Sequence, residues 1–500
     1  MKIKTFILTV VMAIVMIMPM TGVLAKEPYQ GHVYNSYGER VAAPNAFLPA
    51  GILNGTMLGI GQFYKPGDIF VDKDNNLYIL DTGNNRVVIT DENYNLVKVI
   101  DKFTFNGEDS PLKEPSGIFA KNGTLYIADR LNERVVVCDM DGNISKEYRK
   151  PVTDYLEENL TFSPRKLVVN SIDTLYIISD NINEGIVEMD EDGNFESFFG
   201  AETVQLSAED VADLFWRRFF TEEQIAQMAS MSPAAYTNLM IDEHDFIYTA
   251  TSLETNTVDQ LKKLNPNGNN VLTSASFGDV SSEVTSSSSN SSSNNKDANA
   301  FIDVTVDNEG FIYGLDRNSG KIFMYNQRSE NLAIFGKLGS EIGCFGDVSA
   351  IESLKDDILV ADQANDVITI FRPTTYGSLI KKAVNLHETG NYEEALQPWT
   401  TIKGLNNNYE MAYIGIGRAH MLMGEYPEAM YNFKLGNNKE LYSVAKKANR
   451  TQNLREHFGL YILTVIVIIV LIWLAVKYRE QIGEWLKKVL KIKKREKGAK

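Results

Sequence analysis

Short segments in which apolar and polar residues alternate recur along most of the chain. Residues 66–90 read PGDIFVDKDNNLYILDTGNNRVVIT, and residues 115–139 read PSGIFAKNGTLYIADRLNERVVVCD. Alternation of β-branched and aromatic side chains between Asp, Asn and Gly turns predicts β-strands. More degenerate copies of the same pattern cover residues 164–190, 237–265, 301–326 and 347–371. The pattern therefore predicts six small antiparallel sheets.

The six copies align on one position, which is occupied by Tyr78, Tyr126, Tyr176, Tyr248, Tyr313 and Leu359. Two insertions, at 201–235 and 279–300, interrupt an otherwise regular repeat. One such sheet cannot bury both of its faces, whereas sheets stacked radially around an axis bury them against each other. The copies resemble NHL repeats, most strongly in the first two. This resemblance implies a mainly β fold, a six-bladed NHL-type β-propeller over residues 31–373.

The last copy is incomplete. Within each blade we name the strands a to d from the centre to the rim. The sixth copy contains strands a, b and c only, because the chain leaves it at Pro373. We expect residues 32–41, where Tyr and Val alternate, to supply the missing rim strand. Joining both ends of the propeller in one blade removes its last open strand edge.

After Pro373 the apolar period changes from two to that of a helix. The segment GNYEEAL at 390–396 recurs as GEYPEAM at 424–430, which is 34 residues later. This spacing resembles tetratricopeptide repeats and implies a small all-α segment of paired helices over residues 376–456. Two interpretations of it stay open: a surface that binds a peptide or helix of a protein partner, or a rigid spacer.

The two ends of the chain predict export and a membrane anchor. Residues 1–25 combine two Lys, a short apolar run and a small residue at the expected cleavage point, as in a signal peptide. Residues 458–476 carry no charge and are long enough to cross a bilayer, and the tail 477–500 has a net charge of +7. We expect a single-pass cell-membrane protein with its N-terminal domains extracellular and its basic tail cytoplasmic.

Charge narrows the range of partners. Residues 26–476 have a net charge of −25, which repels nucleic acid and therefore predicts that it is not a partner. The two cysteines, Cys138 and Cys344, are too few for an extracellular disulfide framework. Besides the membrane, we expect protein partners, bound through the propeller face and the tetratricopeptide-like segment, and a carbohydrate or peptide as the ligand.

Strand direction sorts the connections between the two faces of the ring. Connections b–c and d–a share one face, which we call the d–a face, and connections a–b and c–d share the other, the a–b face. Both insertions lie on the d–a face: 201–235 is predicted to be helical, and 279–300, rich in Ser and Asn, is predicted to be disordered. We expect the d–a face to point away from the membrane.

Polar b–c connections make the d–a face the candidate binding surface. Its Asp, Asn and Arg side chains suit neutral polyhydroxyl or peptide ligands, although each of them has an alternative role in holding its own turn together. The candidate ligand-binding residues are Asp81, Asn85, Arg86, Asp129, Arg130, Arg134, Asp316, Arg317, Asp362 and Trp216.

Catalytic chemistry has little support in the residues. The chain has five His, none on a predicted central strand, and it contains no HExxH, GxSxG, CxxC or phosphate-binding loop. We therefore predict that it is not an enzyme and has no cofactor, no catalytic residues and no metal site. The predicted function is a membrane-anchored, non-catalytic extracellular binding scaffold, for example an accessory of a surface transporter or envelope complex. The alternative is a metal-dependent propeller hydrolase of the lactonase or esterase type.

Overall fold

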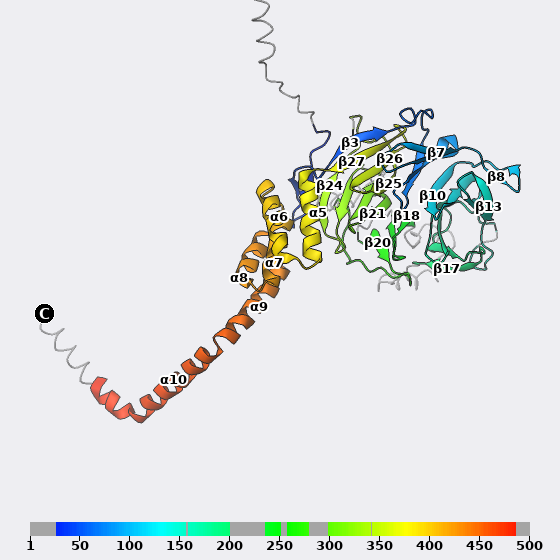
Figure 1. Cartoon of the computed structure of the whole chain (residues 1–500). Helices are drawn as coiled ribbons and strands as arrows, with labels where there is room; N and C mark the ends of the chain where they lie inside the picture. The colour runs from blue at the N-terminus through cyan, green and yellow to red at the C-terminus, as the bar shows by residue number, and fades with distance from the viewer. Residues whose placement is uncertain are drawn as a thin grey trace, which may run out of the picture.

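The computed structural model describes residues 27–156, 159–200, 236–251, 258–279, 299–341 and 343–486. Their strands form six small sheets around a common axis, and the helices lie on one side of this ring (Figure 1). The predicted six-bladed β-propeller followed by a helical segment is confirmed.

The first four blades follow the chain from the centre outwards. Blade 1 contains β4 (Pro66–Val71), β5 (Leu77–Asp81), β6 (Arg86–Thr90) and β7 (Leu96–Ile100). Blade 2 contains β10 (Pro115–Lys121), β11 (Thr124–Asp129), β12 (Arg134–Cys138) and β13 (Asn143–Tyr148), with β8 (Thr104–Phe105) and β9 (Glu108–Asp109) at its edge. Blade 3 contains β14 (Pro164–Val169), β15 (Leu175–Ser179), β16 (Ile186–Met189) and β17 (Phe195–Phe199). Blade 4 contains β18 (Tyr236–Ile241), β19 (Ile247–Thr251) and β20 (Leu261–Leu264).

The last two blades also use the N-terminal strands. Blade 5 contains β21 (Phe301–Val306), β22 (Ile312–Asp316), β23 (Ile322–Tyr325) and β24 (Asn331–Phe335), extended by β1 (His32–Tyr34) and β2 (Arg40–Ala42). Blade 6 contains β25 (Val348–Leu354), β26 (Asp357–Asp362), β27 (Val367–Pro373) and β3 (Phe47–Leu53).

The rim strand of blade 6 is β3, which pairs antiparallel with β27 from Phe47 opposite Pro373 to Leu53 opposite Ile368. The propeller is therefore closed by the N-terminal region, as expected, but the predicted segment was wrong. Residues 32–41 lie in the β1–β2 hairpin, which extends blade 5. The sequence of β3, FLPAGIL, contains a Pro and a Gly that disfavour a strand, yet an outermost strand tolerates Pro because only one of its sides is hydrogen-bonded.

Every innermost strand contains an irregularity at the same place. The ladder between strands a and b shifts register at equivalent positions in all six blades. This shift is a β-bulge, which redirects one side chain. The residues that follow it are Asp68, Gly117, Lys166, Asn238, Asp303 and Ala350. The repeat thus places one variable residue from each blade near the propeller axis.

Hydroxyl groups join neighbouring blades close to these bulges. Ser116 Oγ donates to the Pro164 carbonyl at 2.9 Å, and Thr237 Oγ1 donates to the Phe301 carbonyl at 2.8 Å. Ser349 of blade 6 donates in the same way to the Pro66 carbonyl of blade 1, at 2.8 Å. The contact that links consecutive blades therefore also links the last blade to the first.

The recurring Tyr of the repeat has a structural role. Tyr78 donates its hydroxyl proton to Asp72 Oδ2, and Tyr313 does the same to Asp307 Oδ2, each at 2.9 Å. Both acceptors lie in a–b turns, so the second strand of the blade fixes the turn that precedes it.

The helical segment begins beside blade 5, and its helices contact one another in chain order, with the last one extending away from the ring (Figure 1). It comprises α5 (Thr375–Glu388), α6 (Tyr392–Leu405), α7 (Glu410–Leu422), α8 (Tyr426–Leu435), α9 (Lys439–Glu456) and α10 (Phe458–Lys477). Small residues allow close packing, since a Cβ on Gly415 would lie 2.4 Å from the Trp399 ring. The assignment of this segment to tetratricopeptide repeats stays a prediction from the sequence resemblance.

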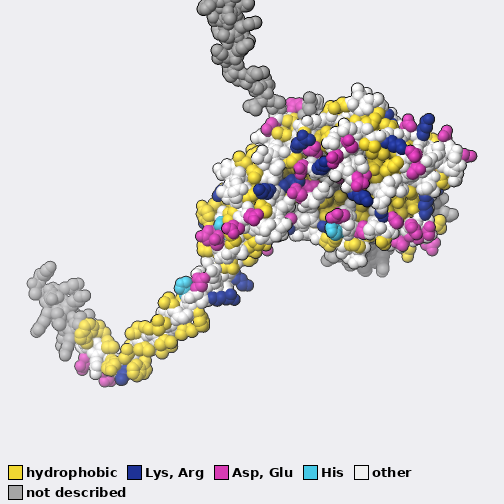
Figure 2. All heavy atoms as spheres, in the orientation of Figure 1, with side chains coloured by type: hydrophobic (Ala, Val, Ile, Leu, Met, Phe, Trp, Pro, Cys, Tyr) yellow, Lys and Arg dark blue, Asp and Glu magenta, His cyan; other side chains and the backbone are white. Residues whose placement is uncertain are grey.

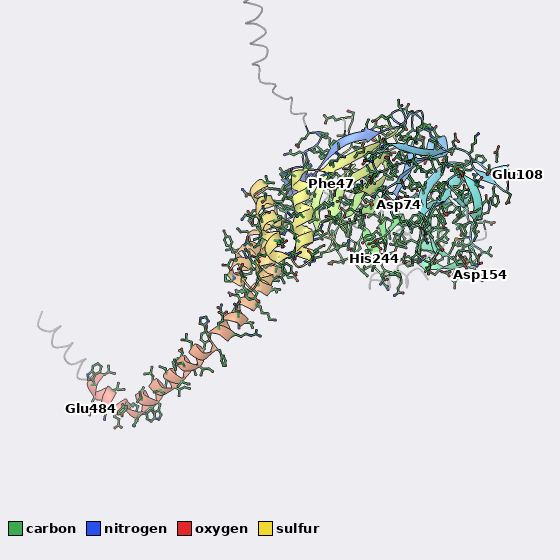
Figure 3. All side chains as sticks on the ribbon, viewed as in Figure 1. Phe47, Asp74, Glu108, Asp154, His244 and Glu484 are labelled. Atoms are coloured by element: carbon green, nitrogen blue, oxygen red, sulfur yellow. The ribbon has the colours of Figure 1, made fainter. Side chains whose placement is uncertain are left out.

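One apolar core is shared by the helices and the propeller. Tyr376 and Ile380 of α5 are buried in the same cluster as Phe47 of β3 and Phe335 of β24. The Tyr409 hydroxyl, next to α7, donates to the Leu332 carbonyl of blade 5 at 2.8 Å. Phe47 is labelled in Figure 3 where β3 passes beside α5. The helical segment is therefore fixed to the propeller rather than loosely tethered to it.

α10 is the helix of the described chain whose length and composition suit a membrane span, with a mean hydropathy of 2.9. None of its residues is buried, and Figure 2 shows a continuous hydrophobic surface along it, at the far end from the ring. The predicted signal peptide, the helical insertion with Trp216 and most of the Ser/Asn-rich insertion lie outside the described residues.

Phe47→Ala tests the closure by β3. The Phe47 side chain is fully buried, and its ring stacks on Phe335 at 4.5 Å between centroids. Its removal should lower the free energy of unfolding by about 3–5 kcal/mol, measured by urea denaturation of the full chain in detergent. Ile52→Ala, on the same strand but 38% exposed, is the control and should cost about 1 kcal/mol or less. Equal effects of the two variants would contradict this closure.

Candidate functional site

The predicted site residues divide into two groups, and the first holds the b–c turns together. Asp81 is fully buried and accepts hydrogen bonds from the Tyr64 N–H and from Arg86 Nε, each at 2.7 Å. Asp129 repeats this arrangement in blade 2 with the Lys113 N–H and Arg134 Nε, again at 2.7 Å.

Asp316 and Asp362 are also buried inside their turns. Asp316 accepts from the Ala300 N–H at 2.6 Å, and Asp362 accepts from the Gly346 N–H at 2.7 Å. Both carboxylates are satisfied by backbone N–H donors and by one side chain of the same turn, Ser319 for Asp316 and Asn365 for Asp362. Within the described structure they point into the turns rather than into the open space above the ring, and a ligand-binding role for them stays a prediction.

The second group lines a cavity of about 670 Å³ on the d–a face, which we call the mouth. Asn85, Arg130 and Arg317 contribute to it from the b–c turns. Four further cations of the mouth were not predicted from the sequence: Lys65, Lys113, Arg165 and Lys166. Each of them lies directly before or at the start of an innermost strand. The signal for all four is positive charge in the d–a connections and in the first residues of each innermost strand, compared blade by blade.

Acidic side chains hold the arginines of the mouth in place. Asp180 bridges Arg130 and Arg165, at 2.8 and 2.6 Å. Asp347 accepts two hydrogen bonds from Arg317, at 2.9 and 2.8 Å. A guanidinium has five N–H donors, so these pairs orient the arginines and leave donors for a ligand.

The floor of the mouth is an ion pair across the propeller axis. Lys166 of blade 3 contacts both carboxylate oxygens of Asp68 in blade 1, at 2.6 and 2.8 Å. Gly117 occupies the equivalent position of blade 2, and a Cβ there would lie 2.5 Å from the Arg165 carbonyl oxygen. Asp68 also accepts from the Ile118 N–H at 2.8 Å. Two side chains, from blades 1 and 3, and the backbone of blade 2 thus meet and close the channel from above.

Two more buried acids lie below this pair. Burial raises the pKa of the Asp303 carboxyl to about 8 and that of the Glu352 carboxyl to about 7. One lysine cannot neutralise three carboxylates in a dry channel. Asp303 therefore keeps its proton at neutral pH and the centre of the propeller contains mainly the one ion pair.

The channel between the two faces is too narrow for a ligand. Its free volume at Lys166, Asp303 and Glu352 is about 10 Å³, which is room for about one water molecule. Among the described residues, the mouth and the cavity on the a–b face are therefore separate bowls.

The cavity on the a–b face is larger, at about 1000 Å³. Phe70 and Phe119 form part of its floor, with their ring centroids 4.8 Å apart. Its walls are the a–b turns, which carry Asp74 and His244, labelled in Figure 3. This bowl was not predicted, because its polar residues are the ordinary turn residues of the repeat.

No group of three or more His, Cys, Asp or Glu is placed to hold a metal ion among the described residues. The donor sets in the channel are instead occupied by Lys166 and by backbone N–H groups. The alternative prediction, a metal-dependent hydrolase, is therefore not supported by any cluster of metal ligands among the described residues.

Comparison with known proteins identifies one repeat in the chain. The NHL repeat family model matches residues 63–89, in blade 1, and no curated protein matches the chain. Virginiamycin B lyase from Staphylococcus aureus is similar at 13% identity over 66% of this chain and 100% of its own, with a TM-score of 0.40. A gluconolactonase from Xanthomonas campestris is similar at 12% identity over 66% and 97%, with a TM-score of 0.39. A luciferin-regenerating enzyme is similar at 12% identity over 65% and 95%, also with a TM-score of 0.39.

These similar structures overturn the prediction that the chain is not an enzyme. They are a lyase, a gluconolactonase and a regenerating enzyme. The shortage of His on the central strands is therefore no basis for excluding catalysis. With identities of 12–13% and TM-scores of 0.39–0.40, none of these reactions is transferred to this chain.

The buried acids predict how stability depends on pH. Because the folded pKa of Asp303 lies near 8, the folded protein holds a proton that the unfolded chain releases above about pH 4. The free energy of unfolding should therefore fall as pH rises from about 4 to about 8. Asp303→Asn should flatten this slope, as measured by the melting temperature between pH 5 and pH 9, whereas the exposed Asp101→Asn should leave it unchanged. An unaltered slope in Asp303→Asn would show that this carboxyl is ionised in the folded state.

Proposed function

We propose that this chain is a membrane-anchored binding protein whose propeller captures a ligand in the mouth. α10 spans the membrane, residues 26–457 are extracellular, and the basic tail is cytoplasmic. The observation that carries the proposal is an open cavity with a closed floor on a chain that also has one exposed, apolar helix. Cavities of about 300–1,000 Å³ with a few converging polar groups are typical of ligand sites.

Helices α5 to α9, which we call the mount, form a rigid connection between the ring and the membrane. Lys381 of α5 lies 3.1 Å from Asp307 and 2.6 Å from Glu309, both in an a–b turn of blade 5. Burial alone would lower the pKa of this ammonium, but the two carboxylates raise it above its usual value. The mount therefore holds the a–b face, which is opposite to the mouth. This arrangement supports a mouth that points away from the membrane.

A protein partner fits this plan. The mount leaves Tyr431 and Leu435 of α8 exposed, and the predicted partner, such as a transporter subunit or an envelope complex, would bind there or on the ring. Deletion of the whole helical segment is unsuitable as a test, because Tyr376 and Ile380 belong to the propeller core.

The native cysteines make the topology directly testable. Cys138 and Cys344 are buried, and burial raises the pKa of both thiols, that of Cys138 to about 12, so they react slowly with maleimides. Tyr37→Cys, at a residue that is 69% exposed, should be labelled in intact cells by a membrane-impermeant maleimide. Lys500→Cys should be labelled only after lysis. The unsubstituted chain is the control, and the reverse pattern would overturn the proposed topology.

The mount is tested by Lys381→Met. Removing the lysine leaves Asp307 buried without its partner, which should lower the free energy of unfolding by about 3 kcal/mol and speed amide hydrogen exchange in α5. Lys382→Met, the exposed neighbour on the same helix, makes the same chemical change and should do neither. Unchanged exchange in α5 of Lys381→Met would mean that this ion pair does not hold the mount.

A further inference from the structure

We infer that the ligand of the mouth is an anion that carries carboxylate or phosphate groups. This inference rests on the proposed role of the mouth and adds the chemical class of what it captures. It departs from the neutral sugar or peptide expected from the sequence, because the aspartates counted there are buried in their turns.

Cationic side chains dominate the lining of the mouth. Among the described residues two carboxylates line it, Glu114 and Asp68, and Asp68 is already paired with Lys166 in the floor. The six cations are Lys65, Lys113, Arg130, Arg165, Lys166 and Arg317. Adding Asp180 and Asp347, which lie behind the arginines, still leaves more positive than negative charge.

Of the six cations of the mouth, Lys65 and Lys113 have the smallest structural role. Both are exposed, and among the described residues neither makes an ion pair; the Lys65 ammonium lies over the Tyr64 ring, 5.5 Å from its centroid. They stand before strand a of blades 1 and 2. Unpaired ammonium groups at the edge of a concave surface raise the local concentration of anions.

The opposite bowl has the reverse charge. Eight carboxylates and four lysines line the cavity on the a–b face. The chain as a whole has a net charge of −16, so a basic mouth departs from the average composition. Charge is therefore sorted by face: the d–a face attracts anions and the a–b face repels them.

The arginines favour oxyanions over simple halide-like ions. Arg130 and Arg317 come from b–c turns of different blades, and their guanidinium planes are fixed by Asp180 and Asp347. A fixed guanidinium binds carboxylate or phosphate through two parallel hydrogen bonds. Because the channel below is closed, the anion is held in the bowl and does not pass through the ring.

The experiment compares charge removal on the two faces of the full chain in detergent. Lys65→Gln/Lys113→Gln removes two cations from the mouth, and Lys73→Gln/Lys355→Gln removes two from the opposite bowl. Binding of tripolyphosphate, tri-galacturonate and the neutral cellotriose is measured by calorimetry at low and at physiological salt, and each variant's melting temperature shows that it is folded. The first two probes distinguish a phosphate from a carboxylate source.

The mouth variant should bind the preferred anion about tenfold more weakly, equivalent to about 1.4 kcal/mol, and binding by the original chain should weaken with added salt. The opposite variant should bind it as the original chain does. Failure of both anions to bind, or equal weakening in both variants, would overturn the inference. If cellotriose binds and the mouth variant loses it, the mouth is a ligand site and only its anionic character is wrong. The membrane topology measured with Tyr37→Cys does not depend on any of these binding results.

Discussion

The pairing of β3 with β27 is the contact on which the rest of the molecule depends. It completes blade 6, and at the same blade Ser349 bonds back to the Pro66 carbonyl of blade 1. Phe47 at the start of β3 enters the core that also holds α5. A single antiparallel pair therefore closes the ring, shapes the bowls on both of its faces and fixes the helical mount. A propeller without this pair would have an open strand edge and a mouth without a fixed outline.

The sequence predicts the ring well because each blade repeats the same local chemistry. The aligned Tyr, the turn Asp and the alternating strands are all local signals. In the structure the Tyr and the Asp bind each other, as in the hydrogen bond from Tyr78 to Asp72. The identity of the closing strand was missed because it is settled by a contact more than 300 residues away in the chain. Local propensity favoured Tyr and Val at 32–41 over the Pro and Gly of β3, and tertiary packing overrode it.

The candidate site could be predicted only in part, for a similar reason. The polar b–c turns are visible in the sequence, but burial decides which of their charges act outside the turn. Asp81 and Asp129 are neutralised inside the fold, while Arg130 and Arg317 reach the mouth. The lysines of the d–a connections join them because six blades converge on one axis. Residues in different copies of a repeat become neighbours in a way that no single copy reveals.

Closure by an N-terminal strand has a consequence for biosynthesis. β3 ends at Leu53, and its partner β27 begins at Val367. A ribosome adds roughly 5–20 residues per second, so β3 waits about 15–60 s before its partner exists. During that time β3 has no permanent neighbour and can pair wrongly with any exposed edge. The ring thus passes from open to closed only after Pro373 has been made, and until then β3 depends on staying unpaired for the chain to fold correctly.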